Sequence, residues 1–394
     1  MEQNDIVIVA AKRTPIGNML GTLSELSAPE LGAVAHRAAI EEAGISPNDI
    51  DEVITGCVLQ AGIGQAPGRQ AAIKAGIPNS VGATTINKMC GSGMKAVMLA
   101  HDLLKAGTAE IVLASGMESM SNAPYLLSKA RAGYRLGHGE LKDHTFLDGL
   151  EDAYERGQLM GVFAEATAAH YHFTRQQQDD YSIRSLTRAI EAHNNNSFAE
   201  EIAPVTISGR KGDVTVSKDE GPDVSKIAKI PQLRPAFKKD GTVTAANSSS
   251  ISDGAASLIL MTAANAKKRG LKPLARIVAH ANHAQAPEWF TTAPVDAIRK
   301  VLSKAGWHQS DVDLYEINEA FAVVAMAAIN QLELDPTKVN IHGGACALGH
   351  PIGASGARIL VTLIHALKQQ QKTRGVAALC IGGGEATAMA IELV

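Results

Sequence analysis

The sequence contains few cysteines and few aromatic residues, and it lacks a long apolar run. Its 394 residues include four cysteines, and aromatic side chains make up only 4% of the chain. Four cysteines, none of them in a Cys-x-x-Cys pair, exclude a disulfide-rich framework and argue against a structural zinc site. The longest uninterrupted apolar run, from Ala320 to Ile329, is too short to span a bilayer.

The charge is also nearly balanced, with 37 basic and 40 acidic side chains and a formal net charge of -3. This balance argues against a nucleic-acid partner. The acidic start from Met1 to Asp5 does not resemble a secretory leader, so we expect a cytoplasmic protein without a membrane partner. The length suits two or three domains of roughly 100–200 residues each.

The most informative feature of the sequence is an internal duplication. Residues 27–53 contain a Ser-Ala-Pro start, a helical pattern, an Ala-Gly stop, and then Asp-Ile-Asp before an apolar run. Residues 292–315 repeat this order as Thr-Ala-Pro, a helical pattern, Ala-Gly and Asp-Val-Asp. The helix start at residues 90–93 is likewise matched at 353–356, so one half of the protein has been copied.

Each copy alternates short apolar strands with amphipathic helices, which indicates an α/β fold with a mostly parallel sheet. In the first copy we expect strands near 5–10, 52–58, 82–87 and 109–115, closed by a strand at 255–261. In the second copy we expect strands near 273–281, 312–317, 338–341, 375–382 and 386–393. The interval between 119 and 250 has interrupted helix and strand patterns and is interpreted as an inserted loop domain.

Candidate reactive side chains occur where strands of this sheet end, which is where ligands bind in doubly wound folds. Cys90 follows the strand at 82–87 and begins a helix, so we expect the helix dipole to lower the pKa of its thiol. His350 occupies the matching helix start of the second copy, and Asn318 and Cys380 follow two further strands. Two thiols and a histidine suit reversible acyl transfer between thioesters, followed by proton transfer next to a carbonyl.

Four motifs resemble the signature blocks of the thiolase family. They are NKMCGSG at 87–93, NEAF at 318–321, GHPIGASG at 349–356 and CIGGG at 380–384. The resemblance covers essentially the whole chain and is strongest toward acetyl-CoA acetyltransferases. It implies duplicated βαβαβαββ halves that form a five-layered α-β-α-β-α core. It also implies domains at 1–118 with 251–270 and at 271–394, with the inserted loop domain at 119–250 for coenzyme A binding and tetramerisation.

The resemblance implies a ping-pong reaction in which coenzyme A is substrate and product, with no cofactor and no metal. Cys90 would carry the acyl group, His350 would activate it, and Asn318 would hold a water in the first oxyanion hole. Cys380 would move the α-proton, and the backbone N–H groups of Cys90 and Gly382 would form the second oxyanion hole. The further positions implied to bind coenzyme A or line the acyl pocket are Ser249, Met160, Leu159, Phe290, Ala320, Phe321 and Lys229.

Three departures from the family pattern concern substrate binding. Leu159 stands where biosynthetic members have histidine, and Phe290 stands where we expect methionine. No arginine in residues 220–223 corresponds to the one that flanks adenine in some members, so Lys226, Lys229 or Arg210 are candidates for the nucleotide contacts. These differences leave the preferred acyl length open, and the resemblance of residues 122–146 to a tetramerisation loop implies a homotetramer.

The leading hypothesis is therefore an acyltransferase that condenses two acetyl-CoA molecules to acetoacetyl-CoA and coenzyme A, or cleaves 3-ketoacyl-CoA in the reverse direction. The main alternative is a degradative 3-ketoacyl-CoA thiolase that prefers longer chains. A decarboxylating ketoacyl synthase is disfavoured by Cys380, and a non-catalytic acyl-CoA carrier is disfavoured by the complete reactive set. Cys346 is interpreted as a packing residue, and His170 and His172 are too poorly spaced on a helix to chelate a metal.

Overall fold

The computed structural model describes residues 2–210 and 212–394 of the chain. The first half contains β1 (Ile6–Arg13), β2 (Gly17–Asn18), α1 (Ala28–Ala43), β3 (Glu52–Gly56), α2 (Pro67–Lys74), β4 (Gly82–Ile86), α3 (Ser92–Lys105), β5 (Ile111–Ser119), β10 (Ser252–Thr262) and α6 (Ala263–Lys268). The second half contains β11 (Ala275–Ala284), α7 (Ala293–Ala305), β12 (Leu314–Ile317), α8 (Ala322–Gln331), α9 (Ala345–Leu348), α10 (Ile352–Gln369), β13 (Arg374–Ile381) and β14 (Glu385–Leu393).

The duplicated halves form one continuous sheet in the order β12-β13-β14-β11-β1-β10-β5-β3-β4. From the centre of the sheet outward, the first half runs β1, β10, β5, β3 and β4, and the second half runs β11, β14, β13 and β12. In both halves the first strand in the chain is therefore central and is followed by the last one. The halves are joined where β1 and β11 pair in antiparallel fashion over two residue pairs. The expectation of a mostly parallel sheet is wrong, because among the described strands of this sheet only the pairs β3–β4, β3–β5 and β12–β13 are parallel. The closing strand of the first half, expected at 255–261, is confirmed as β10, which pairs with both β1 and β5.

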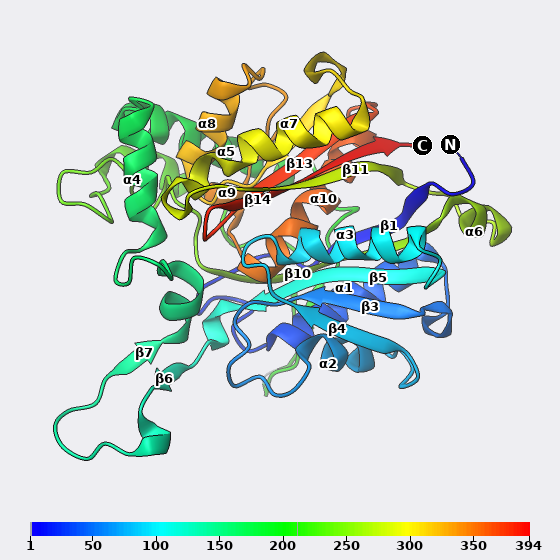
Figure 1. The fold of residues 1–394 in the computed structure, drawn as a ribbon, viewed down its shortest axis with the longest axis horizontal. Coiled ribbons are helices and arrows are strands. Elements are labelled where there is room, and N and C mark those ends of the chain that lie inside the picture. Colours follow the sequence, from blue (N-terminus) through cyan, green and yellow to red (C-terminus); the bar gives the residue numbers. More distant parts are fainter. Residues whose placement is uncertain (1, 211) are drawn as a thin grey trace.

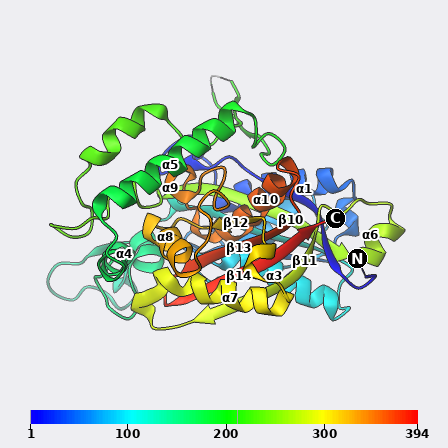
Figure 2. The same ribbon diagram turned by 90° about the horizontal axis from the view of Figure 1, so that it is seen from above.

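The sheet folds back so that its halves face each other across two central helices. Figure 1 shows α7 and α8 outside one half, α3 and α10 between the halves, and α1 and α2 outside the other half. Seen from above, α7 lies along β11 and β14 (Figure 2). The five-layered α-β-α-β-α fold is therefore confirmed.

The same local signals begin and end the corresponding helices of the two halves. The backbone N–H of Ser27 donates to the Glu30 carboxylate at 2.9 Å, which stabilises the start of α1. Gly44 after α1 and Gly306 after α7 adopt left-handed backbone conformations with φ of 65° and 67°. Glycine adopts this conformation at little cost, so it ends each helix at the expected residue.

The central helices α3 and α10 approach each other closely because both present glycine at their crossing. A Cβ atom on Gly93 would lie 2.7 Å from the backbone nitrogen of Ala357, and one on Gly356 would lie 2.3 Å from that of Met94. No side chain fits at such distances, so the two backbones are in direct contact. This contact places the N-terminal ends of α3 and α10 side by side.

One strand prediction is wrong. Residues 338–341 form no named strand and contribute only an isolated bridge between Val339 and Tyr315. Asn340 has a left-handed φ of 49°, which interrupts an extended conformation, and its side chain instead accepts a hydrogen bond from the backbone of Ile317 at 2.8 Å. The side chain of Asn340 thus makes a hydrogen bond to the backbone of β12 that the backbone of a neighbouring strand would otherwise make.

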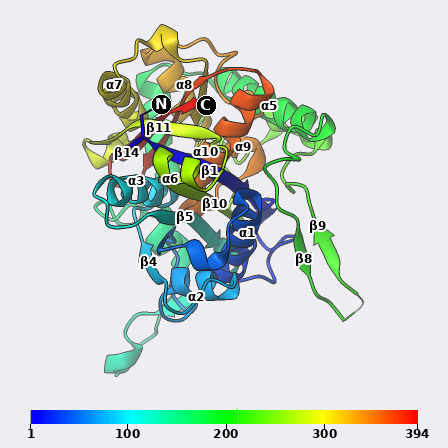
Figure 3. The same ribbon diagram turned by 90° about the vertical axis from the view of Figure 1, so that its right-hand side faces the viewer.

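Residues between β5 and β10 form the excursion expected from the sequence. They contain β6 (Tyr125–Leu127), β7 (Leu141–Asp143), α4 (Met160–His170), α5 (Arg175–Asn194), β8 (Val205–Ile207) and β9 (Val214–Val216). The β6–β7 hairpin extends away from the body (Figure 1), and the β8–β9 hairpin extends on another side (Figure 3). The exact domain boundaries stay a prediction. Among the described helices, none is both long and apolar enough to cross a membrane.

Candidate active site

A cavity of about 330 Å³ lies at the N-terminal ends of α3 and α10. Its walls include most of the site residues that the sequence predicts, namely Cys90, His350, Gly382, Ser249, Leu159, Met160, Phe290, Ala320 and Phe321. These residues come from both halves and from the excursion between β5 and β10. The other two candidates, Cys380 and Asn318, are buried and do not line this cavity.

Cys90 lies in a tight turn between β4 and α3. Met89 before it has a left-handed φ of 48°, and the Asn87 side chain accepts a hydrogen bond from the Met89 backbone at 2.8 Å. Ser92 closes the turn, because its hydroxyl accepts from the Lys88 backbone at 2.8 Å and donates to the Met89 carbonyl at 2.6 Å. The turn fixes the position of the Cys90 side chain before any ligand binds.

The expectation of a lowered Cys90 pKa is wrong for this structure. Burial raises the pKa of the Cys90 thiol to about 11, although the backbone N–H groups of Gly382 and of Cys90 itself act in the opposite direction. Loss of hydration disfavours the thiolate more than the helix end stabilises it. The resting side chain is therefore a thiol, and a neighbouring base is required to remove its proton.

His350 can act as this base, because it lines the same cavity as Cys90 and its Nε2 atom can accept a proton. Nδ1 of His350 lies 2.5 Å from the Ser355 hydroxyl, and the same hydroxyl donates to the Pro351 carbonyl at 3.0 Å, so we assign the shared proton to Nδ1. With the proton on Nδ1, the Nε2 atom keeps its lone pair. Nε2 is buried and has no hydrogen-bond partner among the described residues. Burial also lowers the pKa of His350 to about 3, so the ring is neutral.

Cys380 ends β13 inside an apolar cluster that includes Phe290 and Phe321. It is fully buried, and burial raises the pKa of its thiol well above the usual value. A negative charge on Cys90 acts in the same direction on the Cys380 pKa. The chain segments that carry the two thiols pack against each other, because a Cβ atom on Gly91 would lie 2.4 Å from Cδ1 of Ile381.

Asn318 follows β12 and is 1% exposed. Its backbone N–H donates to the Ala378 carbonyl at 3.0 Å, which fixes it beside β13. Its side-chain Oδ1 receives only a long contact of 3.5 Å from Arg358, and its Nδ2 has no partner among the described residues. A buried amide N–H group without a protein acceptor is suited to hold a water or a substrate oxygen.

The remaining predicted binding residues line two cavities that have wall residues in common. Ser249 lies on the cavity wall and donates its hydroxyl proton to the Ala320 carbonyl at 2.9 Å. Lys229 is not in this wall. It lines an adjoining cavity of about 300 Å³ that shares Ala245 and Ser250 with the first one, and Lys226 and Cys346 line it too.

Two of these placements bear on earlier interpretations. Cys346, interpreted as a packing residue, is partly exposed to the adjoining cavity and donates to the Glu319 carbonyl at 3.7 Å. Arg210 is exposed in the turn of the β8–β9 hairpin and lines neither cavity. The adjoining cavity therefore offers Lys226 and Lys229, rather than Arg210, to a ligand that extends out of the first cavity.

Sequence reasoning missed Glu118, a buried carboxylate directly beneath the site. It accepts backbone hydrogen bonds from Val58 and Leu59 at 3.0 Å each and from Gly353 at 2.9 Å. It thereby connects the first turn of α10 to the loop after β3. Burial raises the pKa of Glu118 to about 7 against these three donors. The signal available in the sequence was a single acidic residue inside an otherwise uncharged strand.

The match to known proteins extends over the same residues. Residues 6–264 match the family model described as "Thiolase, N-terminal domain", and residues 271–393 match "Thiolase, C-terminal domain". The chain is 50% identical to "Acetyl-CoA acetyltransferase" of Cupriavidus necator, with 98% of this chain and 99% of that protein covered. It is also 50% identical to "Acetyl-CoA acetyltransferase, mitochondrial" of Rattus norvegicus, with 99% and 91% covered.

Solved structures agree with these sequence matches. The crystal structure of the Bacillus anthracis acetyl-CoA acetyltransferase superimposes with a TM-score of 0.97 at 43% identity, covering 99% of each chain. The chain therefore belongs to the thiolase family, and its fold is the thiolase fold.

Proposed function

We propose that this protein is an acetyl-CoA C-acetyltransferase, which reversibly condenses two acetyl-CoA molecules to acetoacetyl-CoA and free coenzyme A. The observation that carries the proposal is the unpartnered Nε2 of neutral His350 in a cavity shared with the Cys90 thiol. The names of relatives near 50% identity over nearly the whole chain support the acetyl substrate over the longer-chain alternative.

The first half-reaction transfers an acetyl group to Cys90. Nε2 of His350 takes the thiol proton while the sulfur attacks the thioester carbonyl of acetyl-CoA, and the imidazolium then returns the proton to the departing coenzyme A thiolate. His350 in its imidazolium form and a water held by Nδ2 of Asn318 stabilise the carbonyl oxygen as it gains charge. The product is acetyl-Cys90 and free coenzyme A.

The second half-reaction forms the carbon–carbon bond. Nε2 of His350 takes the thiol proton of Cys380, the Cys380 thiolate takes a proton from the α-carbon of a second acetyl-CoA, and the resulting carbanion attacks the acetyl-Cys90 carbonyl. The N–H groups of Cys90 and Gly382 stabilise the oxyanion, and acetoacetyl-CoA leaves as the Cys90 thiolate regains a proton from the His350 imidazolium. No electron transfer occurs, so the reaction balances without a cofactor or metal.

The substrate arm would extend from the first cavity to the adjoining one, which shares Ala245 and Ser250 with it. The acyl group occupies the first cavity between Met160, Phe290 and Phe321, and the pantetheine arm passes Ser249 toward the second cavity. Lys226 and Lys229 in the second cavity supply positive charge for the phosphates of coenzyme A. The tight aromatic wall around the acyl group supports the preference for an acetyl unit.

The experiment is a coupled thiolysis assay over 3-ketoacyl-CoA substrates of increasing chain length, with Cys90→Ala and Cys346→Ala as paired variants. We expect the highest kcat/KM with acetoacetyl-CoA, loss of turnover in Cys90→Ala, and retained turnover in Cys346→Ala. Undiminished turnover in Cys90→Ala would exclude the proposed mechanism. A maximum at longer chains would instead identify the degradative alternative.

We further propose a cytoplasmic homotetramer. The β6–β7 hairpin exposes large apolar side chains, with Leu136 99% and Leu141 68% exposed, and such surfaces in a hairpin usually meet another chain. Reduced thiols at Cys90 and Cys380 are required by the mechanism, which suits a reducing compartment. Light scattering of Leu136→Asp tests the assembly, since a tetramer held through this hairpin should fall to a smaller oligomer, and an unchanged mass would contradict its role.

A further inference from the structure

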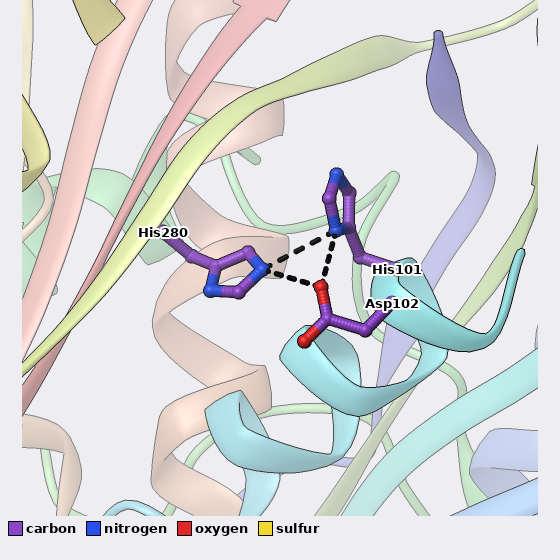
Figure 4. Close-up of side chains that lie close together, drawn as sticks. All are labelled: His101, Asp102 and His280. Atoms are coloured by element: carbon purple, nitrogen blue, oxygen red, sulfur yellow. Dashed lines mark hydrogen bonds and ion pairs between the residues drawn. The ribbon is translucent and has the colours of Figure 1, made fainter. Parts of the chain in front are cut away.

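A cluster of two histidines and one aspartate lies outside the proposed active site. His101 and Asp102 are in the last turns of α3, and His280 is in β11 (Figure 4). Among the described residues these three form the one group of histidine, cysteine and carboxylate side chains whose ligand atoms all lie close enough to hold a metal ion. Sequence analysis did not anticipate it, because His280 is distant along the chain and reaches α3 only through the fold.

The ligand atoms form a nearly equilateral triangle. Nε2 of His280 lies 3.2 Å from Nδ1 of His101 and 3.0 Å from Oδ1 of Asp102, and Nδ1 of His101 lies 3.0 Å from the same oxygen. Nitrogen and oxygen ligands lie about 2.1 Å from a zinc-type ion, so neighbouring ligands are about 3.0 Å apart at right angles and about 3.4 Å apart at tetrahedral angles. The observed triangle therefore matches one face of an octahedron.

We propose that His101, Asp102 and His280 form a binding site for a divalent first-row transition-metal ion. Two imidazoles and one carboxylate on a single face are a donor set that binds such ions and leaves further positions to water. The Asp102 side chain is 54% exposed, so these positions open to solvent. The inference is independent of the proposed reaction, since the site is about 2.5 helical turns along α3 from the Cys90 end.

The surroundings set limits on the affinity. The Lys304 ammonium from α7 donates to the backbone carbonyl of His280 at 3.1 Å, and its positive charge opposes a bound cation. In the absence of an ion, the same distances suit two imidazole N–H groups that share the Asp102 oxygen. The negative charge of Asp102 thus stabilises either a bound cation or, without one, the two imidazole N–H donors.

A bound ion would connect the two halves of the protein. His101 and Asp102 belong to α3 of the first half, whereas His280 belongs to the first strand of the second half. An ion that binds the folded chain more tightly than the unfolded chain raises the stability of the folded state by mass action. The expected function of the site is therefore structural, and basal turnover should not depend on it.

The test is calorimetric titration of the chelator-treated, desalted full-length enzyme with Zn²⁺, alongside absorption spectra with Co²⁺. The variants are His280→Ala and Asp102→Asn, and the matched control is His283→Ala on the same strand. We expect one ion per chain, lost in both variants and retained in the control, with Zn²⁺ raising the melting temperature only where it binds. The Co²⁺ complex should lack sulfur-to-metal charge transfer.

Two results would overturn the proposal. One is the absence of stoichiometric binding to the wild-type enzyme. The other is stoichiometric binding that persists in both variants, which a sulfur charge-transfer band would assign to cysteine. Circular dichroism confirms that each variant is folded, and because Asp102→Asn preserves the size of a partly exposed side chain, it keeps the test valid if His280→Ala unfolds.

Discussion

Replacement of Ser355 by alanine tests how the fold prepares His350. Ser355 is fully buried in the first turn of α10, and its hydroxyl accepts from Nδ1 of His350 at 2.5 Å. Alanine would leave the Nδ1 proton buried without a partner, at a cost of about 1–3 kcal/mol. Moving the proton to Nε2 relieves this cost but removes the lone pair that accepts the Cys90 proton. At about 1.4 kcal/mol per tenfold, acyl transfer should slow roughly 10- to 100-fold.

The structure offers a matched control for this substitution. His36 and Ser257 form a second buried histidine–serine pair, with Nδ1 of His36 2.9 Å from the Ser257 hydroxyl, and neither residue lines the cavity. Ser355→Ala and Ser257→Ala therefore each remove the hydroxyl that faces a buried histidine Nδ1, and each should lower the free energy of unfolding by about 1–3 kcal/mol. Only Ser355→Ala should slow the formation of the acyl-enzyme.

The assay is the single-turnover acetylation of the enzyme by labelled acetyl-CoA, with urea unfolding measured in parallel. If Ser355→Ala acetylates at the wild-type rate, the tautomer argument for His350 is incorrect. If Ser257→Ala slows acetylation as much as Ser355→Ala does, the effect is a general loss of stability. We therefore expect the two variants to lose similar stability, and only Ser355→Ala to acetylate more slowly than the wild type.

Three further predictions concern other parts of the structure. In the wild type, the stability contributed by Glu118 should fall as the pH rises from 4.5 through about 7. The reason is that burial raises the pKa of Glu118 in the folded chain to about 7, whereas the carboxyl group of the unfolded chain releases its proton at lower pH. Glu118→Gln should reduce this pH dependence of the free energy of unfolding, measured by urea unfolding. Met160→Ala should enlarge the acyl cavity and raise kcat/KM for longer 3-ketoacyl-CoA relative to acetoacetyl-CoA by roughly tenfold in the coupled assay. Arg13→Met should destabilise the protein by about 3–5 kcal/mol in urea unfolding, because it removes the buried guanidinium that pairs with the carboxylates of Glu201 and Asp219.

Most of the fold could be predicted from the sequence because local signals repeat in the two halves. Proline near the start of a helix and glycine at its end have the same backbone consequences in α1 and in α7, so their positions locate both helices. The exception at 338–341 depends on tertiary contacts, since Asn340 bonds Ile317 with its side chain rather than continuing a strand. A side chain that replaces strand pairing leaves no periodic pattern to detect.

For the site, the sequence indicated which residues gather at one end of the sheet but not their protonation. The pKa of Cys90 depends on how much water the fold excludes, and this burial outweighs the helix end that the sequence made visible. The tautomer of His350 depends on the single hydroxyl proton of Ser355, which is directed to the Pro351 carbonyl. Both properties come from three-dimensional packing and hydrogen-bond direction, so neither follows from residue spacing.

The direct contact between α3 and α10 explains why the proposed chemistry requires both copies of the duplicated half. Cys90 precedes α3 in the first copy, and His350 precedes α10 in the second copy. The distance between these two helix starts is fixed by backbone contact at Gly93 and Gly356, where any larger residue would separate the helices. A side chain at either glycine would move the thiol away from the imidazole without altering either residue. The separation of nucleophile and base is therefore set by two residues that take no part in the chemistry.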